Sequence, residues 1–387
     1  MIPDYQQEAA QLQGTILALR AALHAEPELG NREFKTAARI EQTLRGLGIE
    51  TRRVTETAIV ATLRGALPGP TVAFRADIDA LPIQEATGAA FSSRVPGVMH
   101  ACGHDVHVAA ALGAAMLLQR HLDTLSGKVR FLFQPDEEGD GGAERMIAAD
   151  CLRGVSAVFG AHVSPEFPEG DVAVRYGKFY AASDMLRITV RGKGAHGAER
   201  EKGIDALGAA ALLVTRLLAL PDRFPEDRSV VSIGSLHAGS AGNIIPDAAT
   251  IKGILRTLGP DNRAAMNALV YETCRAVEAE TGATVECSII ASYPGVVNHD
   301  AETALAEQAA QALLGAERVH RIETPTMKTE DFGYFLMEKP GTYYHVGAGC
   351  SVPLHNAAFL PTTDCVVTTA AVNAAVLHTY LSRETSR

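Results

Sequence analysis

The sequence predicts an α/β protein in which one discontinuous domain is interrupted by a smaller inserted α+β domain. The chain has 387 residues, more than one ordinary hydrophobic core organises. Up to Ser183, helical patterns alternate with short, almost wholly apolar strands, as in sheets covered by helices on both faces. After Ser183 the strands alternate apolar and polar residues, and after Asn298 the first texture returns. We therefore predict the domain segments 1–182, 183–294 and 295–387.

The elements of the first segment follow from hydrophobic periodicity and turn signals. Two helices are predicted where apolar residues recur at helical spacing, and each stops at a Gly-containing turn, namely at 4–24 and 36–46. Apolar runs predict four strands, at 57–65, 71–79, 128–135 and 157–163. Two further helices are expected, one running to about His121 and one over 143–150.

The inserted segment has the order strand, helix, strand, strand, helix, strand. Its half-buried strands are predicted at 184–192, 229–239, 248–258 and 284–293, and its helices at 204–220 and 262–281. This order is typical of a small α+β sandwich.

Composition excludes several classes of function. A net charge of −10 and a pI near 5.7 disfavour binding to nucleic acid or to an acidic membrane. The N-terminus lacks the pattern of a signal peptide, and no apolar run reaches about 18 residues. Six scattered cysteines suit reduced thiols better than a disulfide framework. We therefore expect a soluble cytoplasmic protein rather than a secreted or membrane protein.

Two segments concentrate side chains that bind metals. Cys102 and His104 flank a glycine just before a helix, so a thiolate and an imidazole can converge on one ion. The alternative is a free cysteine beside surface histidines. Glu137 and Glu138 directly follow the strand at 128–135, where α/β sheets place active sites. Their side chains diverge, so one can bind metal while the other faces substrate water, although such a pair is often only a solvated loop.

Two more histidines are weaker signals by themselves. His162 ends the apolar strand at 157–163, and His355 lies in a loop rich in Gly and Pro. His100 and His107 are expected only to frame the turn and the helix start.

Together these segments form a series of motifs that points to a family. In chain order they are FRADIDALP, HACGHDVH, PDEEG, AHV, GKGAHG, NIIPD, TEDF and LHN. The series resembles the hippurate hydrolase and auxin-conjugate amidohydrolase branch of the aminoacylase and carboxypeptidase G superfamily. The resemblance covers essentially the whole chain, with HACGHD and PDEEG its most specific parts. It implies a zinc-peptidase-like catalytic domain and an inserted ferredoxin-like domain that acts in dimerisation or as a lid.

The resemblance also implies roles for individual residues. The positions that match ligands of two divalent metal ions per subunit are Cys102, His104, Glu138, His162 and His355. Glu137 matches the general base, and Asp79 matches a carboxylate that orients the site from behind the ligands. Asp77 stands where other branches of the superfamily have a histidine ligand.

Three positions of the inserted domain match residues that meet the substrate. His196 matches a histidine that reaches the scissile carbonyl, in several relatives across a dimer interface. Asn243 and Arg256 match substrate-binding positions, and a guanidinium suits a carboxylate because it can bind both oxygens. The segment 199–201 departs from the small residue and Pro-His of relatives, and Ile254 stands where Thr is common. Both departures put the specificity in doubt and leave the metal chemistry untouched.

The sequence therefore predicts a homodimeric, or larger, metal-dependent amidohydrolase. Its substrate would be an N-acyl amino acid with an acetyl, benzoyl or similar group, cleaved by a metal-activated water with Glu137 as general base. The metal would be manganese, zinc, cobalt or nickel. The enzymatic alternatives are an N-acetyl-diaminopimelate-type deacetylase, a dipeptidase or carboxypeptidase, and an enzyme with Cys102 as nucleophile. A non-catalytic metal-dependent binding protein is a further alternative, which the presence of Glu137 disfavours.

Overall fold

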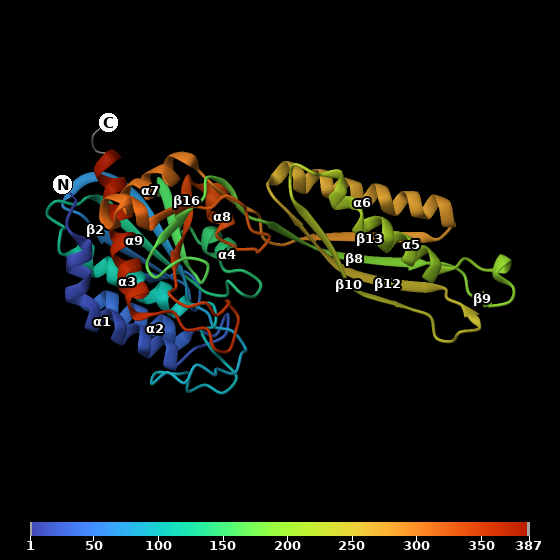
Figure 1. Ribbon diagram of the computed structural model, residues 1–387, viewed down its shortest axis with the longest axis horizontal. Helices are drawn as coiled ribbons and strands as arrows, with labels where there is room; N and C mark the ends of the chain where they lie inside the picture. The colour runs from blue at the N-terminus through green and yellow to red at the C-terminus, as the bar shows by residue number, and fades with distance from the viewer. Residues whose placement is uncertain (1, 385–387) are drawn as a thin grey trace. The chain divides into compact units, whose positions relative to one another are not determined.

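The computed structural model describes residues 2–384, which form two compact units (Figure 1). Within the described residues, the first unit comprises 2–177, 298–323 and 334–384, and the second comprises Lys178–Val297 and Thr324–Gly333. The predicted class, an α/β domain with an inserted α+β domain, is confirmed. The domain limits given by the sequence stay a prediction, and their outermost residues, 1 and 387, lie outside the described residues.

The first unit is built around an eight-stranded mixed sheet with the order β1-β2-β4-β3-β5-β16-β6-β15. The strands are β1 Glu50–Arg53, β2 Ile59–Arg64, β3 Leu67–Asp77, β4 Ser126–Gln134, β5 Ala157–Ser164, β6 Val172–Val174, β15 Val319–Arg321 and β16 Gly341–Gly347. The middle strands β4, β3, β5 and β16 run parallel. Their carboxyl ends therefore meet at one edge of the sheet, where α/β proteins place their ligands.

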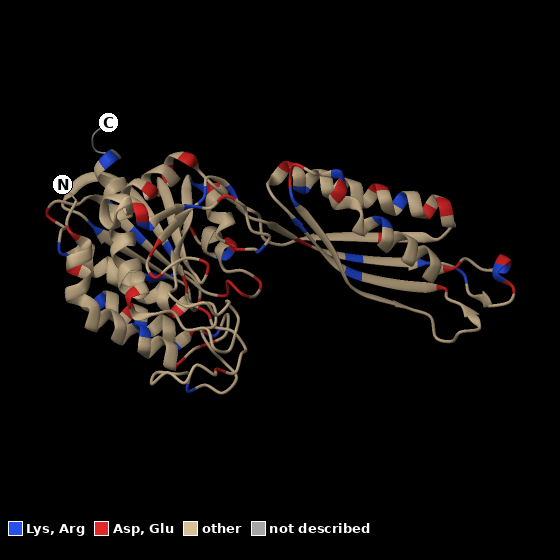
Figure 2. Cartoon of the chain, viewed as in Figure 1, with Lys and Arg blue, Asp and Glu red and all other residues tan. Residues whose placement is uncertain are grey.

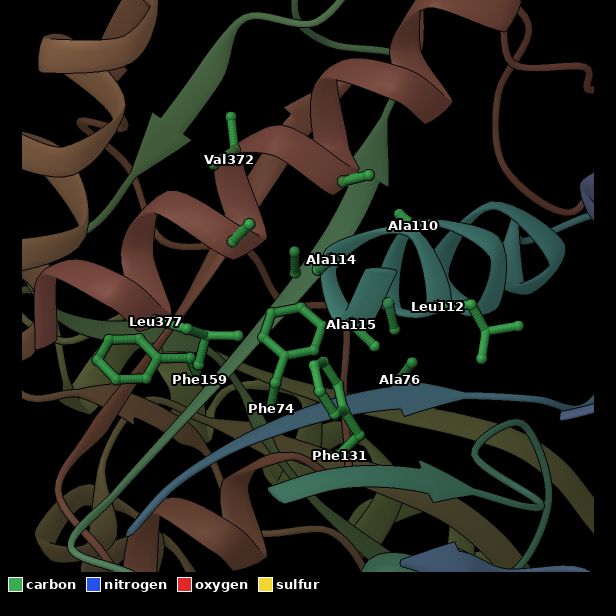
Figure 3. Packing of buried hydrophobic residues seen from close by; sticks show 14 of the residues in the cluster. Phe74, Ala76, Ala110, Leu112, Ala114, Ala115, Phe131, Phe159, Val372 and Leu377 are labelled. Carbon is green, nitrogen blue, oxygen red and sulfur yellow. The ribbon is translucent and has the colours of Figure 1, made fainter. Parts of the chain in front are cut away.

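Helices of the first unit enclose an apolar core against this sheet. They are α1 Tyr5–Ala25, α2 Phe34–Gly46, α3 His104–Gln119, α4 Ala143–Ala148, α7 Asp300–Leu314, η3 Ala316–Arg318, α8 Gly333–Glu338 (which starts at the boundary of the second unit) and α9 Thr363–Glu384. Helices α1, α3 and α9 pack against one another, and α3 and α9 also contact β3. In Figure 3, Phe74, Phe131 and Phe159 of the sheet lie among alanines of α3 and Leu377 of α9. Burying each such side chain contributes about 1.5–3 kcal/mol.

Two helices of this core are buried on almost all sides. Every residue of α3 from His104 to Leu118 is buried, as expected of a helix inside a large domain. The stretch Thr363–Arg383 of α9 has the length and hydropathy of a membrane span, but 78% of its apolar window is buried inside the protein. Helix α9 is therefore a core helix of the first unit.

The second unit is an antiparallel sheet with the order β10-β12-β8-β13, covered on one face by two helices. Its main elements are β8 Ala182–Arg191, α5 Ala206–Leu218, β10 Ser229–Ala238, β12 Ala248–Thr257, α6 Pro260–Thr281 and β13 Thr284–Ala291. This chain order is the predicted ferredoxin-like one. Met266, Val270, Cys274 and Val277 form the buried stripe of α6, and charges of both signs follow the rest of that helix (Figure 2).

Short elements complete the second unit and its border. They are β7 Gly177–Tyr180, which belongs to a two-stranded sheet with β14 Val296–Asn298, then β9 Ala195–His196, which pairs with β11 Ile244–Ile245, and the 3₁₀ turns η1 Arg200–Lys202 and η2 Leu220–Arg223.

Candidate metal centre

Side chains that bind metals lie at the carboxyl ends of three neighbouring parallel strands. Asp77 ends β3, the pair Glu137 and Glu138 follows β4, and His162 lies near the end of β5. The turn that carries Cys102 enters the same edge immediately before α3. The order of the sheet, rather than the order of the chain, therefore brings these distant motifs together.

The structure brings all five predicted ligand side chains into one cluster. Ligand atoms of Cys102, His104 and His162 lie within 4.8 Å of one another, and so do those of Cys102, Glu138 and His355. The Sγ atom of Cys102 is 3.3 Å from Nε2 of His162, and Nε2 of His355 is 2.9 Å from Oε1 of Glu138. The cluster thus consists of two sets of ligand atoms that share one sulfur.

The glycine between the first two ligands is required by the turn. Gly103 is the N-cap of α3 and has a φ of 86°, in the left-handed region that favours glycine. A Cβ atom there would lie 2.4 Å from Cγ2 of Val163, in the strand that carries His162. A side chain at this position would therefore push apart two segments that both supply ligands.

The histidine orientations fit a divalent cation. Nδ1 of His104 donates to the carbonyl oxygen of Asp79 at 2.9 Å, and Nε2 of His104 is buried without a hydrogen-bond partner. Nδ1 of His162 donates to the carbonyl oxygen of Val163 at 2.6 Å, which turns Nε2 toward the sulfur of Cys102. Metal-binding histidines are oriented in this way through their other ring nitrogen. Imidazole, thiolate and carboxylate together suit zinc and its transition-metal neighbours.

Asp79 connects two of the ligand-bearing loops. Its carboxylate is buried, with Oδ1 3.2 Å from Nδ1 of His104 and Oδ2 accepting the backbone N–H of Glu138 at 3.0 Å. Both carboxylate oxygens are therefore used as acceptors, one for each loop, and the side chain faces the ligands from behind.

The electrostatics of the cluster favour a positive charge. Burial alone would lower the pKa of His104, but the negative charges of Asp77 and Asp79 outweigh it and raise that pKa to about 10. Burial raises the pKa of the Cys102 thiol well above its usual range, and the charges of Glu138 and Glu137 raise it further. A divalent cation would neutralise this surplus of negative charge and stabilise the thiolate.

Burial lowers the pKa of His162 well below its usual range, and the neighbouring His107 lowers it further. His162 is therefore a neutral imidazole. The lone pair of its Nε2 is available to a cation, which is the form in which histidine binds a metal.

Glu137 lies beside the ligands. It is buried, and its carboxylate lies within 4.8 Å of ligand atoms of His104 and Glu138. It does not belong to either group that contains Cys102. The arrangement can therefore hold a proton acceptor next to a metal centre.

His107 has a larger part in the site than the sequence indicated. Its Nδ1 donates to Asp77 at 2.5 Å, and its Nε2 accepts the backbone N–H of Val163 at 3.0 Å. Asp77 also accepts a hydrogen bond from Arg75 at 2.6 Å. His107 thus joins the end of β3 to the end of β5 beneath the ligands. The signal that could have identified it is its spacing of three residues from His104, which places both rings on one face of α3. His100, in contrast, is buried with both ring nitrogens unpartnered.

The predicted substrate residues lie at two ends of the second unit. His196 is exposed on β9, and Gly197 donates to the carbonyl oxygen of Asn243 at 2.8 Å, so these two residues are neighbours. Arg256 lies near the other end of β12, where it donates to Oγ of Ser183 at 2.7 Å. Arg256 lies eight positions along β12 from Ala248, the end toward β9, which is about 26 Å of extended chain. This unit therefore does not bring His196 and Arg256 to one small ligand.

The two departures from the motifs are both accessible. The segment 199–201 runs into η1, where Lys202 pairs with Glu199 at 2.6 Å and Arg200 pairs with Asp205 at 3.3 Å. Ile254 is 36% exposed on the face of β12 that the helices do not cover.

Comparisons with known proteins agree with this geometry. The model of peptidase family M20/M25/M40 matches residues 73–379. Thermostable carboxypeptidase 1 of Saccharolobus solfataricus is 36% identical over 376 residues, covering 94% of this chain and 95% of the relative. An N-acetylcysteine deacetylase of Bacillus subtilis is 37% identical over 348 residues, covering 89% and 91%.

A solved structure shows the same fold. The YxeP protein of Bacillus subtilis, described as a dinuclear metal binding peptidase of the M20 family, superposes with a TM-score of 0.87 at 34% identity, covering 96% of this chain and 99% of that one. The family resemblance seen in the motifs is thereby confirmed. The chain belongs to peptidase family M20/M25/M40 and is a hydrolase of that family.

Proposed function

We propose that the protein is a metal-dependent amidohydrolase that cleaves the amide bond of N-acyl amino acids, with an acetyl, benzoyl or similar acyl group. The observation that carries the proposal is the pair of ligand sets that share the sulfur of Cys102, with the carboxylate of Glu137 beside them. The deacetylase relative, whose name gives an N-acetyl amino acid as its substrate, supports this substrate class.

The proposed centre holds two divalent ions per subunit. Its ligands would be Cys102, His104, Glu138, His162 and His355. A soft thiolate favours zinc, while the imidazoles and the carboxylate also suit manganese, cobalt or nickel. When bound, the ions supply Lewis-acid chemistry, which acidifies water and polarises the amide carbonyl.

The side chains would divide the remaining work. Glu137 accepts a proton from the attacking water and delivers it to the nitrogen of the leaving amine, so that the C–N bond breaks and acid and amine are released. His196 donates a hydrogen bond to the carbonyl oxygen as negative charge develops there. Asp79 keeps His104 in the tautomer that presents Nε2 to the centre. Arg256 binds the substrate carboxylate and Asn243 contacts the substrate.

We further propose a cytoplasmic homodimer in which His196 serves the active site of the partner subunit. The separation of His196 from Arg256 within the second unit supports this proposal, since about 26 Å is far longer than an N-acyl amino acid. If both residues contact the same substrate, they come from different subunits. A two-fold axis then completes both sites at once.

A metal and substrate survey tests the proposal. Elemental analysis of the purified protein should find up to two divalent ions per chain. Protein stripped by a chelator and reloaded in turn with zinc, manganese, cobalt and nickel should hydrolyse members of a panel of N-acetyl and N-benzoyl amino acids. Failure on the whole panel with every metal would leave the metal-dependent binding protein as the better description.

Glu137→Gln separates catalysis from metal binding. The variant should keep its metals and lose activity by about 10²–10⁴-fold, because the amide cannot accept the proton of water. The matched control is Glu144→Gln, an exposed glutamate in the helix that follows the same loop. A metal-loaded Glu137→Gln protein with wild-type activity would contradict the mechanism.

The second candidate is a dipeptidase or carboxypeptidase, which the similarity to a thermostable carboxypeptidase favours. It shares the centre and the base with an amidohydrolase, so the substrate panel must decide. Preference for peptides with a free N-terminus over N-acyl amino acids would support it. The panel should also contain N-acetyl-diaminopimelate, the substrate of the remaining deacetylase alternative. Activity that survives chelation but not thiol alkylation would instead identify Cys102 as a nucleophile.

A further inference from the structure

The residue that precedes the two glutamates has a strained backbone. Asp136 has a φ of 59°, in the left-handed region that a residue with a side chain adopts at a cost in free energy. Its backbone leads directly into Glu137 and Glu138. Such a conformation persists only where neighbouring groups hold it, and here it also sets the directions in which the two glutamates leave the main chain.

A buried carboxylate from a distant segment holds this backbone. Oε1 of Glu33 accepts the N–H of Asp136 at 3.0 Å and the N–H of Asn31 at 3.0 Å. Asn31 in turn donates from Nδ2 to Oδ2 of Asp136 at 2.6 Å. Glu33 is fully buried and is separated from Asp136 by 103 positions in the chain. Burial raises the pKa of Glu33 to about 7. Oε1 can accept both N–H groups in the ionised and in the protonated form, so the geometry of these contacts holds the backbone.

An arginine closes this network from outside. Arg145 donates from one nitrogen to Oδ2 of Asp136 at 3.0 Å and from another to Oδ1 of Asn31 at 2.6 Å. The four residues Glu33, Asn31, Asp136 and Arg145 thus form a closed ring of hydrogen bonds, called here the Asp136 clamp.

Close packing leaves the clamp little freedom. A Cβ atom at Gly30 would lie 2.1 Å from Oδ1 of Asp136, and one at Gly139 would lie 2.3 Å from the same atom. The Asp136 side chain is therefore enclosed between two glycines that cannot be enlarged without moving it.

The Glu33 side chain does not cap the helix that Glu33 precedes. It is the N-cap residue of α2, yet its side chain makes no cap hydrogen bond. Glu28 does that work instead, since its carboxylate accepts the N–H groups of Lys35 and Thr36, both at 2.9 Å. The Glu33 carboxylate is thus directed away from its own helix and into the loop that carries Glu137 and Glu138.

We propose that Glu33 is a positioning residue for the metal centre, which acts by fixing the backbone of Asp136 and so aiming Glu138 at the metal and Glu137 at the attacking water. This inference rests on the proposed function only in its claim about Glu137 and the rate of hydrolysis. Its metal-binding part can be tested whatever the substrate is.

The test uses the full-length protein and three variants of one short segment. Glu33→Ala leaves the buried N–H of Asp136 and the part-buried N–H of Asn31 without their acceptor. Loss of such supporting contacts typically costs 10–100-fold in metal affinity or activity. Glu33→Gln keeps an oxygen acceptor and should recover most of the loss. Glu28→Ala is the matched control, since it removes the carboxylate that caps α2 in the same segment. It should lower the melting temperature without changing metal retention.

The readouts separate positioning from general stability. Zinc retention is measured by competition with a chromophoric chelator at a temperature where all variants are folded by circular dichroism, and kcat and KM are measured on zinc-loaded protein. Weaker retention in Glu33→Ala than in Glu28→Ala, with a fall in kcat larger than the rise in KM, supports the proposal.

Equal zinc retention in Glu33→Ala, Glu28→Ala and wild type overturns the proposal. If Glu33→Ala does not fold, the decision passes to Asn31→Ala, which removes the side-chain hydrogen bond to Asp136 within the clamp and must weaken zinc retention. Unchanged retention in Asn31→Ala would then overturn the proposal. A wild type that binds zinc but hydrolyses no substrate of the panel contradicts the proposed function and leaves the zinc comparison to decide on Glu33.

Discussion

At the scale of single residues, the centre depends on which atoms can accept hydrogen bonds. Asp79 offers an acceptor to each of two donors, Nδ1 of His104 and the backbone N–H of Glu138. A neutral amide at the same position has one acceptor and one donor, so it can satisfy only one of them. The charge of this carboxylate also contributes to the raised pKa of His104.

Asp79→Asn should therefore weaken metal binding by about 10–100-fold while the protein stays folded. The affinity is measured by chelator competition. The exposed Asp150, which follows α4, offers a control through Asp150→Asn. Unchanged affinity in Asp79→Asn would show that the contacts of Asp79 do not support the ligands.

A second residue-scale prediction concerns pH. Tyr5 of α1 donates its hydroxyl to Nδ1 of His378 of α9 at 2.6 Å. Burial, and then the neighbouring His121, lower the pKa of His378 from 6.5 to about 4. Between these values the unfolded chain binds the proton more tightly than the folded one. Neutral His378 therefore makes its full contribution to the free energy of unfolding above about pH 6.5, and this contribution is lost as the pH falls toward 4.

The measurement is urea unfolding at several pH values for wild type and His378→Asn. The wild type should lose about 2 kcal/mol more than the variant between pH 6.5 and 4, after allowance for solvent screening. Taking the difference between the two proteins removes the carboxylates, which titrate in both. Parallel pH curves would contradict the assigned neutral state of His378.

At the scale of elements, the turn into α3 decides how close two ligand-bearing segments come. Gly103→Ala should lower the unfolding free energy by about 2 kcal/mol and reduce metal retention. The added methyl group would clash with Val163, and alanine would also be strained at this positive φ. Gly88→Ala is the matched control, since Gly88 also has a positive φ, of 70°, but open space around it. Equal losses in the two variants would show that strain alone matters and that the contact with Val163 does not.

The sequence predicted elements well where one strong local signal controls them. The helix before the first turn, the apolar strands β4 and β5 and the order of the inserted unit all follow from periodicity, and their observed ends lie within a few residues of those expected. The Gly103 turn and the paired glutamates after β4 were also visible, because each is a short local pattern. These parts required no knowledge of the tertiary structure.

Two supporting residues, Glu33 and His107, were missed in the sequence for a physical reason. Glu33 lies just before the helix predicted at 36–46, and nothing near it indicates a partner 103 positions away. His107 was expected only to frame the turn and the helix start, because the acceptor of its proton, Asp77, ends the strand β3, 30 positions earlier in the chain. Contacts of this kind depend on the order of strands in the sheet, which local patterns do not specify.

At the scale of the whole molecule, the proposed dimer makes a prediction that needs no structure of the complex. His196→Ala and Glu137→Gln should each be nearly inactive alone. If His196 serves the partner subunit, a mixed dimer restores one intact site, which combines the His196 of one chain with the Glu137 of the other. Random exchange makes about half of the dimers mixed, with one of two sites intact, so about one quarter of wild-type activity should return.

Exchange of subunits is verified first with differently tagged chains and light scattering. No recovery after verified exchange would show that His196 acts within its own subunit or does not act. A monomer by light scattering would exclude the shared site directly.

The discontinuity of the first unit has a consequence for the making of the protein. Four of the five proposed ligands are synthesised before the second unit, but His355 and the strand β16 follow it. A ribosome-bound chain that has not passed the second unit therefore holds an incomplete centre and an unfinished sheet. The complete metal centre would form only after the segment that follows the second unit has folded onto the first, so that hydrolytic activity arises only when folding is complete.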